Sequence, residues 1–174
     1  VDTKNISKFL SSLQKPLHYL DFETLNPPVP FFDGMRRYQR ITFQFSLHIV
    51  SSQDIVHKEF LHDSKEDPRK AFLEKLKEYL GTKGSIIVYN QSFELGVLKE
   101  LVDVYPDYRK WFEGVRDRVV DLLVPFRNFW YYNPKQKGSA SIKKVLPAVV
   151  GKDYSDLDID NGDLANIMYY NSIY

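Results

Sequence analysis

Two acidic residues near the start of the chain are spaced so that both side chains leave the same face of a strand. Asp21 and Glu23 stand two positions apart at the end of the run 17–23, and alternate residues of a strand project to one side. The apolar neighbours Leu20 and Phe22 indicate partial burial, and partly buried charges are paired or bound to a metal. An isolated pair of this kind would more simply be two solvated carboxylates on an edge strand. In this context the pair predicts a site for magnesium, manganese or calcium, which prefer carboxylate oxygens, rather than for zinc.

A second group of polar residues follows the apolar run 85–89. This run predicts a short buried strand, and the apolar spacing from Ser92 onward predicts a helix. Asn90 and Glu94 therefore lie where open α/β sheets bind their ligands. Taken alone, they are explained by capping through Asn90 or Ser92 and by a favourable helix dipole at Glu94. With Asp21 and Glu23 on a neighbouring strand, Glu94 adds a third carboxylate, and three carboxylates close together predict a two-metal site.

A third acidic region, 153–163, has the composition of a calcium loop but not its spacing. With Asp156 as position one, the glycine falls one place late, and Ile167 stands where the bidentate glutamate belongs. Most of these aspartates are expected to lie in a solvated loop. Asp163 differs because it begins a predicted helix, 163–172, with a face suited to packing.

Strands and helices alternate in the pattern of apolar residues, which predicts an α/β fold with a mixed sheet of about five strands flanked by helices. The sheet is expected to carry Asp21 and Glu23 on a central strand. Predicted strands lie at 17–23, 41–51, 55–61 and 85–89, the middle two as a hairpin. Predicted helices lie at 3–14, from a cap at Asp67 to 80, from 92, at 107–114, in 119–129 with Asp121 as a cap, at 142–150 interrupted by Pro147, and at 163–172.

Length and composition limit the class of protein. The 174 residues fit one domain, 1–174, and 43% hydrophobic residues allow a proper core. The absence of cysteine excludes disulfides, cysteine nucleophiles and thiolate zinc sites, and suits the cytoplasm, the expected location. No apolar stretch is long enough to cross a bilayer, so no membrane partner is expected. Because the chain does not begin with methionine, we expect it to be a domain excised from a longer protein.

Four motifs carry a resemblance to a known family. They are LDFET at 20–24, IIVYNQSFE at 86–94, VVDLL at 119–123 and GDLANIMYY at 162–170. In this order they resemble the DnaQ-like (DEDD) 3′–5′ exonucleases of the ribonuclease-H-like superfamily, whose four acidic residues hold two magnesium ions. Residues 16–174 resemble more closely an uncharacterised bacterial domain family that is often found behind a RecB-like nuclease domain. The motifs of that family are LDFET, RYQ, FQFSLH, YNQSFE and SIKKVLP.

The resemblance implies roles for particular residues. Asp21 and Glu23 match the first exonuclease motif, Glu94 stands where the second motif usually has aspartate, and Asp163 is the expected fourth acid. These four would be catalytic, with Asp21, Glu23 and Asp163 as ligands of two Mg²⁺ or Mn²⁺ ions. The residues expected to support them are Asn90, Asp121 and Tyr154. The resemblance also implies an attached RecB-like nuclease domain as a partner in the full-length protein.

One part of the exonuclease pattern is missing. Active members carry a histidine five residues before the last aspartate, or a tyrosine four before it, as the base that deprotonates water. Asp158 and Ile159 occupy those positions here. Either another group such as Tyr154 or a metal-bound hydroxide takes that role, or turnover is slow or absent, because a lost general base typically costs about a hundred- to ten-thousand-fold in rate.

Two segments interleave cations with aromatic residues, a mixture that suits a single strand of nucleic acid. The residues predicted to bind it are Arg36, Arg37, Tyr38, Arg40, Lys143 and Lys144. Solvated basic loops beside core aromatics explain the same pattern. The four histidines match no metal-ligand spacing and are expected to be ordinary strand residues.

The leading functional hypothesis is therefore a metal-dependent nuclease that hydrolyses nucleic-acid phosphodiesters from a single-stranded 3′ end. The competing hypothesis is a catalytically weak or inactive nucleic-acid-binding or scaffolding module of a larger nuclease protein. A third is hydrolysis of a small phosphodiester or nucleotide. Degradation of a labelled single strand in magnesium or manganese separates the first two hypotheses, and activity on mononucleotide esters without polymer processing would indicate the third.

Overall fold

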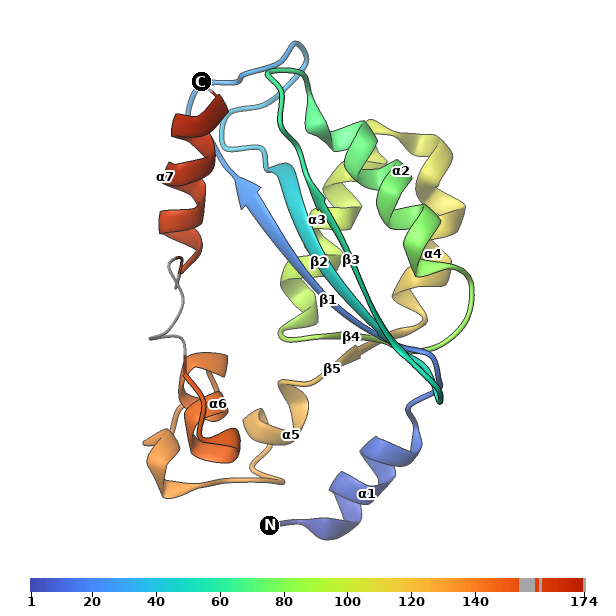
Figure 1. Ribbon diagram of the computed structural model, residues 1–174, viewed down its shortest axis with the longest axis vertical. Coiled ribbons are helices and arrows are strands. Elements are labelled where there is room, and N and C mark those ends of the chain that lie inside the picture. The colour runs from blue at the N-terminus through green and yellow to red at the C-terminus, as the bar shows by residue number, and fades with distance from the viewer. Residues whose placement is uncertain (154–158, 160, 174) are drawn as a thin grey trace.

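The computed structural model describes residues 1–153, 159 and 161–173, and its centre is one mixed sheet (Figure 1). The strand order is β3-β2-β1-β4-β5. β1 pairs antiparallel with β2 and parallel with β4, β2 pairs antiparallel with β3, and β4 pairs parallel with β5. The five strands are β1 (Leu17–Leu25), β2 (Ile41–Val50), β3 (Ile55–Leu61), β4 (Ile86–Val88) and β5 (Val119–Asp121). The predicted α/β fold, with a mixed sheet of five strands flanked by helices and with Asp21 and Glu23 on its central strand, is confirmed.

Helices flank the sheet on both sides. Figure 1 shows α2, α3 and α4 on one side of the sheet, α7 beside β1 on the other, and α6 near α5. The helices are α1 (Thr3–Ser11), α2 (Pro68–Leu80), α3 (Gln91–Val104), α4 (Arg109–Arg116), α5 (Val124–Arg127), α6 (Ile142–Val150) and α7 (Gly162–Ile173), with short 3₁₀ helices at Pro106–Tyr108 and Pro134–Gln136. No helix in these described ranges is both long and apolar enough to cross a membrane.

The larger hydrophobic core lies between the sheet and the helices α2 to α4. Leu20 and Phe22 enter it from β1, and the Phe22 ring meets the Phe72 ring of α2 edge-on, with centroids 5.1 Å apart. Because side chains alternate along a strand, this burial turns Asp21 and Glu23 to the opposite face. The main core therefore fixes which face of β1 carries the acids.

A smaller core attaches α7 near the end of β1. Tyr169 of α7 packs with Leu25, Ile41 and Phe43. The Tyr169 and Phe43 rings are stacked, with centroids 4.0 Å apart and planes 11° from parallel. This contact sets the position of the helix that bears Asp163.

Several predicted boundaries held and others did not. The hairpin is confirmed, and α2 begins with the expected cap, in which the Arg69 amide donates to Asp67 Oδ1 at 3.0 Å. α1 ends at Ser11 rather than at 14, and β1 continues to Leu25. α6 runs through Pro147 instead of being interrupted there. The sequence pattern therefore located these elements better than it located their ends.

The prediction that Asp121 caps a helix is wrong. Asp121 is the last residue of the strand β5. β5 pairs with β4, with Val88 opposite Asp121. The carboxylate Oδ1 accepts hydrogen bonds from the Asn90 and Leu123 amides, both at 2.9 Å. Parallel pairing with β4 therefore outweighed the local capping signal.

Candidate functional site

The central strand holds the first two acids side by side on one face. Asp21 lies opposite Ser46 of β2 and Glu23 lies opposite Gln44, and the register shifts immediately after Glu23. Asp21 is exposed and Glu23 is half-buried. The predicted projection of both carboxylates from one face is therefore present, with less burial of Asp21 than the sequence suggested.

Glu94 is the most buried acid of the site. It lies in the first turn of α3 and is 3% exposed. Burial, together with the negative charges of Asp21 and Asp121, raises the pKa of Glu94 to about 8. Its Oε2 is buried without a hydrogen-bond partner among the described residues. A buried acceptor without a donor is unusual and calls for an explanation, such as a bound ion.

The other two acids are affected by the same surroundings. Burial of its carboxyl group raises the pKa of Asp21, although the residue as a whole is exposed. Burial and then the charge of Asp21 raise the pKa of Glu23. Within the described ranges, none of the three acids forms an ion pair with a protein cation. The Asp21 charge therefore acts on both Glu23 and Glu94, and no protein cation of the described residues neutralises these acids.

The turn that carries Glu94 is held from β5. Asn90 has φ 78°, a left-handed conformation that asparagine tolerates, and occupies the cap position of α3 without a side-chain cap hydrogen bond. Its amide instead donates to Asp121. Asn90 therefore occupies the predicted cap position but does not form the side-chain cap hydrogen bond. The Asp121 carboxylate instead supports the turn by accepting from the backbone amide of Asn90.

The residue before Asp163 lies beside the site. A Cβ placed on Gly162 would lie 3.3 Å from Glu23 Oε2, so α7 begins directly beside that carboxylate. Asn161 Oδ1 accepts from the Leu164 amide and caps the helix. Asp163 follows Gly162 with an exposed side chain. In the part of the chain that the structure describes, no three His, Asp or Glu side chains are gathered closely enough to hold an ion. Tyr154 lies outside the described residues.

The predicted nucleic-acid-binding residues divide into two groups. Arg40 is held by α3, because its Nη2 lies 2.6 Å from Glu100 Oε1 and its guanidinium lies 5.7 Å from the centre of the Phe93 ring. This arrangement gives Arg40 a structural role. The remaining side chains are exposed, and they are Arg36, Arg37, Tyr38, Lys143 and Lys144.

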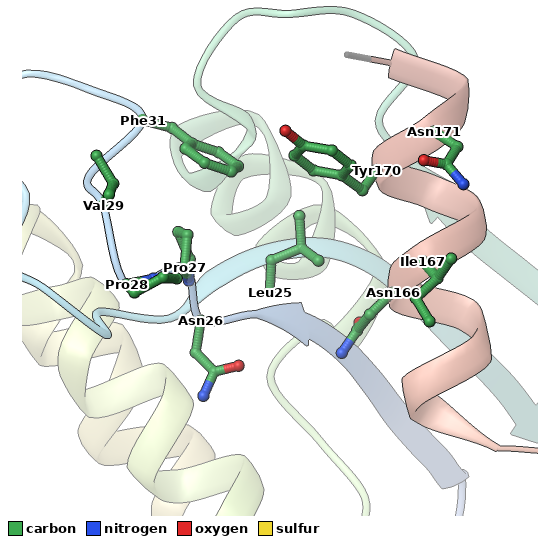
Figure 2. A pocket seen from close by; sticks show the side chains of 10 residues that line it. All are labelled: Leu25, Asn26, Pro27, Pro28, Val29, Phe31, Asn166, Ile167, Tyr170 and Asn171. Carbon is green, nitrogen blue, oxygen red and sulfur yellow. The ribbon is translucent and has the colours of Figure 1, made fainter.

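Two hollows lie along β1, and Asp21 lines one of them. The α7 pocket, about 620 Å³, lies between α7 and the loop that follows β1, and Figure 2 shows Phe31 and Tyr170 above Leu25 and Asn166. Asn166 Oδ1 is buried there without a partner among the described residues. The sheet pocket, about 330 Å³, is bounded by Asp21 together with residues of β2, β4 and α6. One hollow therefore lies at each end of the acidic face.

Sequence reasoning missed two residues of the sheet pocket, Tyr89 and His48. The sequence pattern predicts Tyr89 only as the end of a strand, although this residue directly precedes Asn90. It predicts His48 as an ordinary strand residue. Its alternation with Ser46 along β2 was a usable signal, but the register that brings β2 beside Asp21 is a long-range property that no local pattern contains.

The fold and the site together define an α/β domain with an open mixed sheet and a group of acids beside the ends of its central strands. Residues 18–141 match DUF2779, described as a domain of unknown function. Because this match covers more than half of the chain, the chain belongs to that family. The expectation of an uncharacterised family is confirmed.

Two curated bacterial proteins are similar to the chain. "Uncharacterized protein UU173" of Ureaplasma parvum is 25% identical over 170 residues, which are 83% of this chain and 24% of that protein. "Uncharacterized protein MG366" of Mycoplasma genitalium is 26% identical over 178 residues, which are 89% of this chain and 26% of that protein. The chain therefore spans about a quarter of the length of these relatives.

Proposed function

We propose that the chain is a metal-dependent nuclease domain of the DnaQ-like type, which hydrolyses nucleic-acid phosphodiesters from a 3′ end. The observation that carries this proposal is Glu94, a buried acid with an unpartnered oxygen beside Asp21. Such a group is costly in a protein unless a cation neutralises it. The motif order of the DnaQ-like exonucleases supports the same conclusion.

The donor set fits Mg²⁺ or Mn²⁺, since it consists of carboxylate oxygens only. Asp21 and Glu23 would hold the ions from β1, and Asp163 would contribute from α7. When bound, two ions would supply an activated water and stabilise the leaving 3′ oxygen. Glu94 would lose its proton as the cations bind.

The α7 pocket supports a nucleoside as the ligand next to the acids. Phe31 and Tyr170 offer rings for stacking on a base. The side-chain amides of Asn26, Asn166 and Asn171 can hydrogen-bond to base edges or to a sugar. A terminal nucleoside seated there would leave its phosphate near Glu23.

The test is the degradation of a 5′-labelled single strand in Mg²⁺ or Mn²⁺. We expect stepwise shortening from the 3′ end, and Asp21→Asn should reduce the rate at least about a hundredfold, as expected when a metal ligand is lost. Asp117→Asn, a charge loss at an exposed ion pair with Arg116, is the matched control and should keep the wild-type rate. Equal rates for wild type and Asp21→Asn would contradict the proposal.

The exposed position of Asp163 favours a second candidate, a binding or scaffolding module without turnover. This candidate predicts that wild type binds the oligonucleotide and degrades it with neither metal.

Because the relatives are about four times as long as the chain, we further propose that a RecB-like nuclease domain accompanies it. Activity on mononucleotide esters alone would instead indicate a small-phosphodiester hydrolase.

A further inference from the structure

The sheet face that carries Asp21 also carries two histidines, side by side. His48 of β2 lies directly opposite His57 of β3, and their rings are stacked, with centroids 4.4 Å apart and planes 18° from parallel. His57 Nε2 lies 3.2 Å from Ser46 Oγ, and Ser46 in turn lies opposite Asp21. A continuous row of polar side chains therefore leads from the first acid of the site to the histidine pair.

His48 and Asp21 also line one hollow. The sheet pocket is bounded by Asp21, Ser46 and His48 on the sheet side and by Tyr89 and Ile142 across from them. At about 330 Å³ it has room for a phosphate group and several waters. A phosphate bound at Asp21 would therefore share this hollow with the His48 imidazole.

The other two histidines are placed elsewhere. His18 is buried on the main-core face of β1. His62 Nε2 lies 3.0 Å from both the Glu66 carbonyl oxygen and Ser64 Oγ, beyond the end of β3. His48 is therefore the histidine that adjoins the acids within the described part of the chain.

We propose, on the basis of the proposed nuclease function, that His48 is the general base of the reaction and that His57 positions it. The water oxygen forms a bond to phosphorus as its proton passes to the His48 imidazole. The bond from phosphorus to the 3′ oxygen breaks, and that oxygen takes a proton from solvent. The base thus comes from the sheet instead of from the segment before the last helix, where its usual positions hold Asp158 and Ile159.

The surroundings of His48 suit this role. Histidine is the side chain that ordinarily changes charge between about pH 5 and 8. The groups that face His48 are Tyr19 and Asp21 from β1, His57 and Glu59 from β3, and Tyr89 after β4. The His57 ring, stacked on His48, limits the rotation of the His48 imidazole.

The experiment compares His48→Gln, His57→Gln and the control His62→Gln in the same exonuclease assay. We expect His48→Gln to lower kcat about a hundred- to ten-thousand-fold with KM nearly unchanged, and to remove the acid limb of the pH–rate profile. Added imidazole should restore part of its rate. His57→Gln should lower kcat about tenfold and keep the acid limb of the pH–rate profile. His62→Gln should have the kcat and the pH–rate profile of wild type.

Two measurements without turnover exclude a structural explanation. Because both rings are exposed, the melting temperature of His48→Gln should match that of wild type. Its affinity for the oligonucleotide in Ca²⁺ should also be unchanged. Wild-type kcat and pH profile in His48→Gln, while Asp21→Asn is inactive, would overturn the role of His48 alone. A wild-type protein inactive in both metals would overturn the nuclease function and this inference together.

Discussion

Glu94 combines burial with the lack of a neighbouring cation or hydrogen-bond donor for its Oε2 among the described residues, so the fold favours its neutral form. The folded protein keeps a proton on this carboxyl group up to about pH 8, whereas an unfolded chain releases it near 4.5. Between these values the folded state binds more protons than the unfolded state, so the free energy of unfolding must fall as the pH rises. In the absence of metal, the acid cluster therefore weakens the fold at neutral and alkaline pH.

Replacing Glu94 should reverse this loss. Glu94→Gln keeps the shape of the side chain and removes the ionisation, so we expect it to be more stable than wild type at pH 8 by roughly 2 to 4 kcal/mol, and similar at pH 5, since one pKa unit corresponds to about 1.4 kcal/mol. Thermal unfolding in EDTA across this pH range measures the difference. Glu78→Gln, at an exposed pair with Lys75, should follow wild type. A Glu94→Gln curve parallel to wild type would show that Glu94 is ionised in the fold.

At the scale of elements, α7 depends on its contact with β2. Tyr169→Ala removes the ring stacked on Phe43, and we expect a loss of about 2 to 4 kcal/mol, as for other large core truncations. It should also abolish nuclease activity below its melting temperature, because α7 no longer begins beside Glu23. Activity and unfolding measured at the same temperature check this result.

Leu76→Ala is the matched control for that variant, since Leu76 is fully buried in the core under α2. It should lose similar stability and keep its activity below the melting temperature. If Tyr169→Ala were as active as Leu76→Ala at equal stability, α7 would have no part in the site.

The sequence predicted elements best where a local pattern was long. The cap at Asp67 and the alternation around Asp21 are both local, and both were predicted correctly. β5 was missed because three residues are too few to show a period, and its pairing with β4 comes from distant residues. The ion pair of Arg40 with Glu100 and the placement of His48 beside Asp21 likewise depend on tertiary contacts. The sequence around Arg40 and His48 therefore could not show which distant residue each of them would lie beside.

At the scale of the molecule, the two faces of the sheet are unlike. One face is closed by the main core, and the other bears the acids between two pockets. The formal net charge of +1 gives little overall attraction for nucleic acid. The acidic face would repel phosphates unless cations were bound to it first.

Nucleic-acid binding should therefore depend on divalent ions. We expect the affinity for a single-stranded oligonucleotide to be at least about tenfold higher in Ca²⁺ than in EDTA at equal ionic strength, because the cations remove the repulsion. Fluorescence anisotropy measures both affinities. Asp21→Asn should lose most of the difference, and Asp117→Asn should retain it. Equal binding of wild type in both buffers would place the nucleic acid away from the acids.

The carboxylate of Asp121 links the margin of the sheet to this chemistry. A three-residue edge strand is ordinarily the first part of a sheet to fray. Fraying of β5 would withdraw one oxygen from the amides of both Asn90 and Leu123, and the turn before Glu94 would be released with it. Loosening of this outer strand would thereby reach the interior acid, so the geometry around Glu94 depends on the order of a three-residue margin of the sheet.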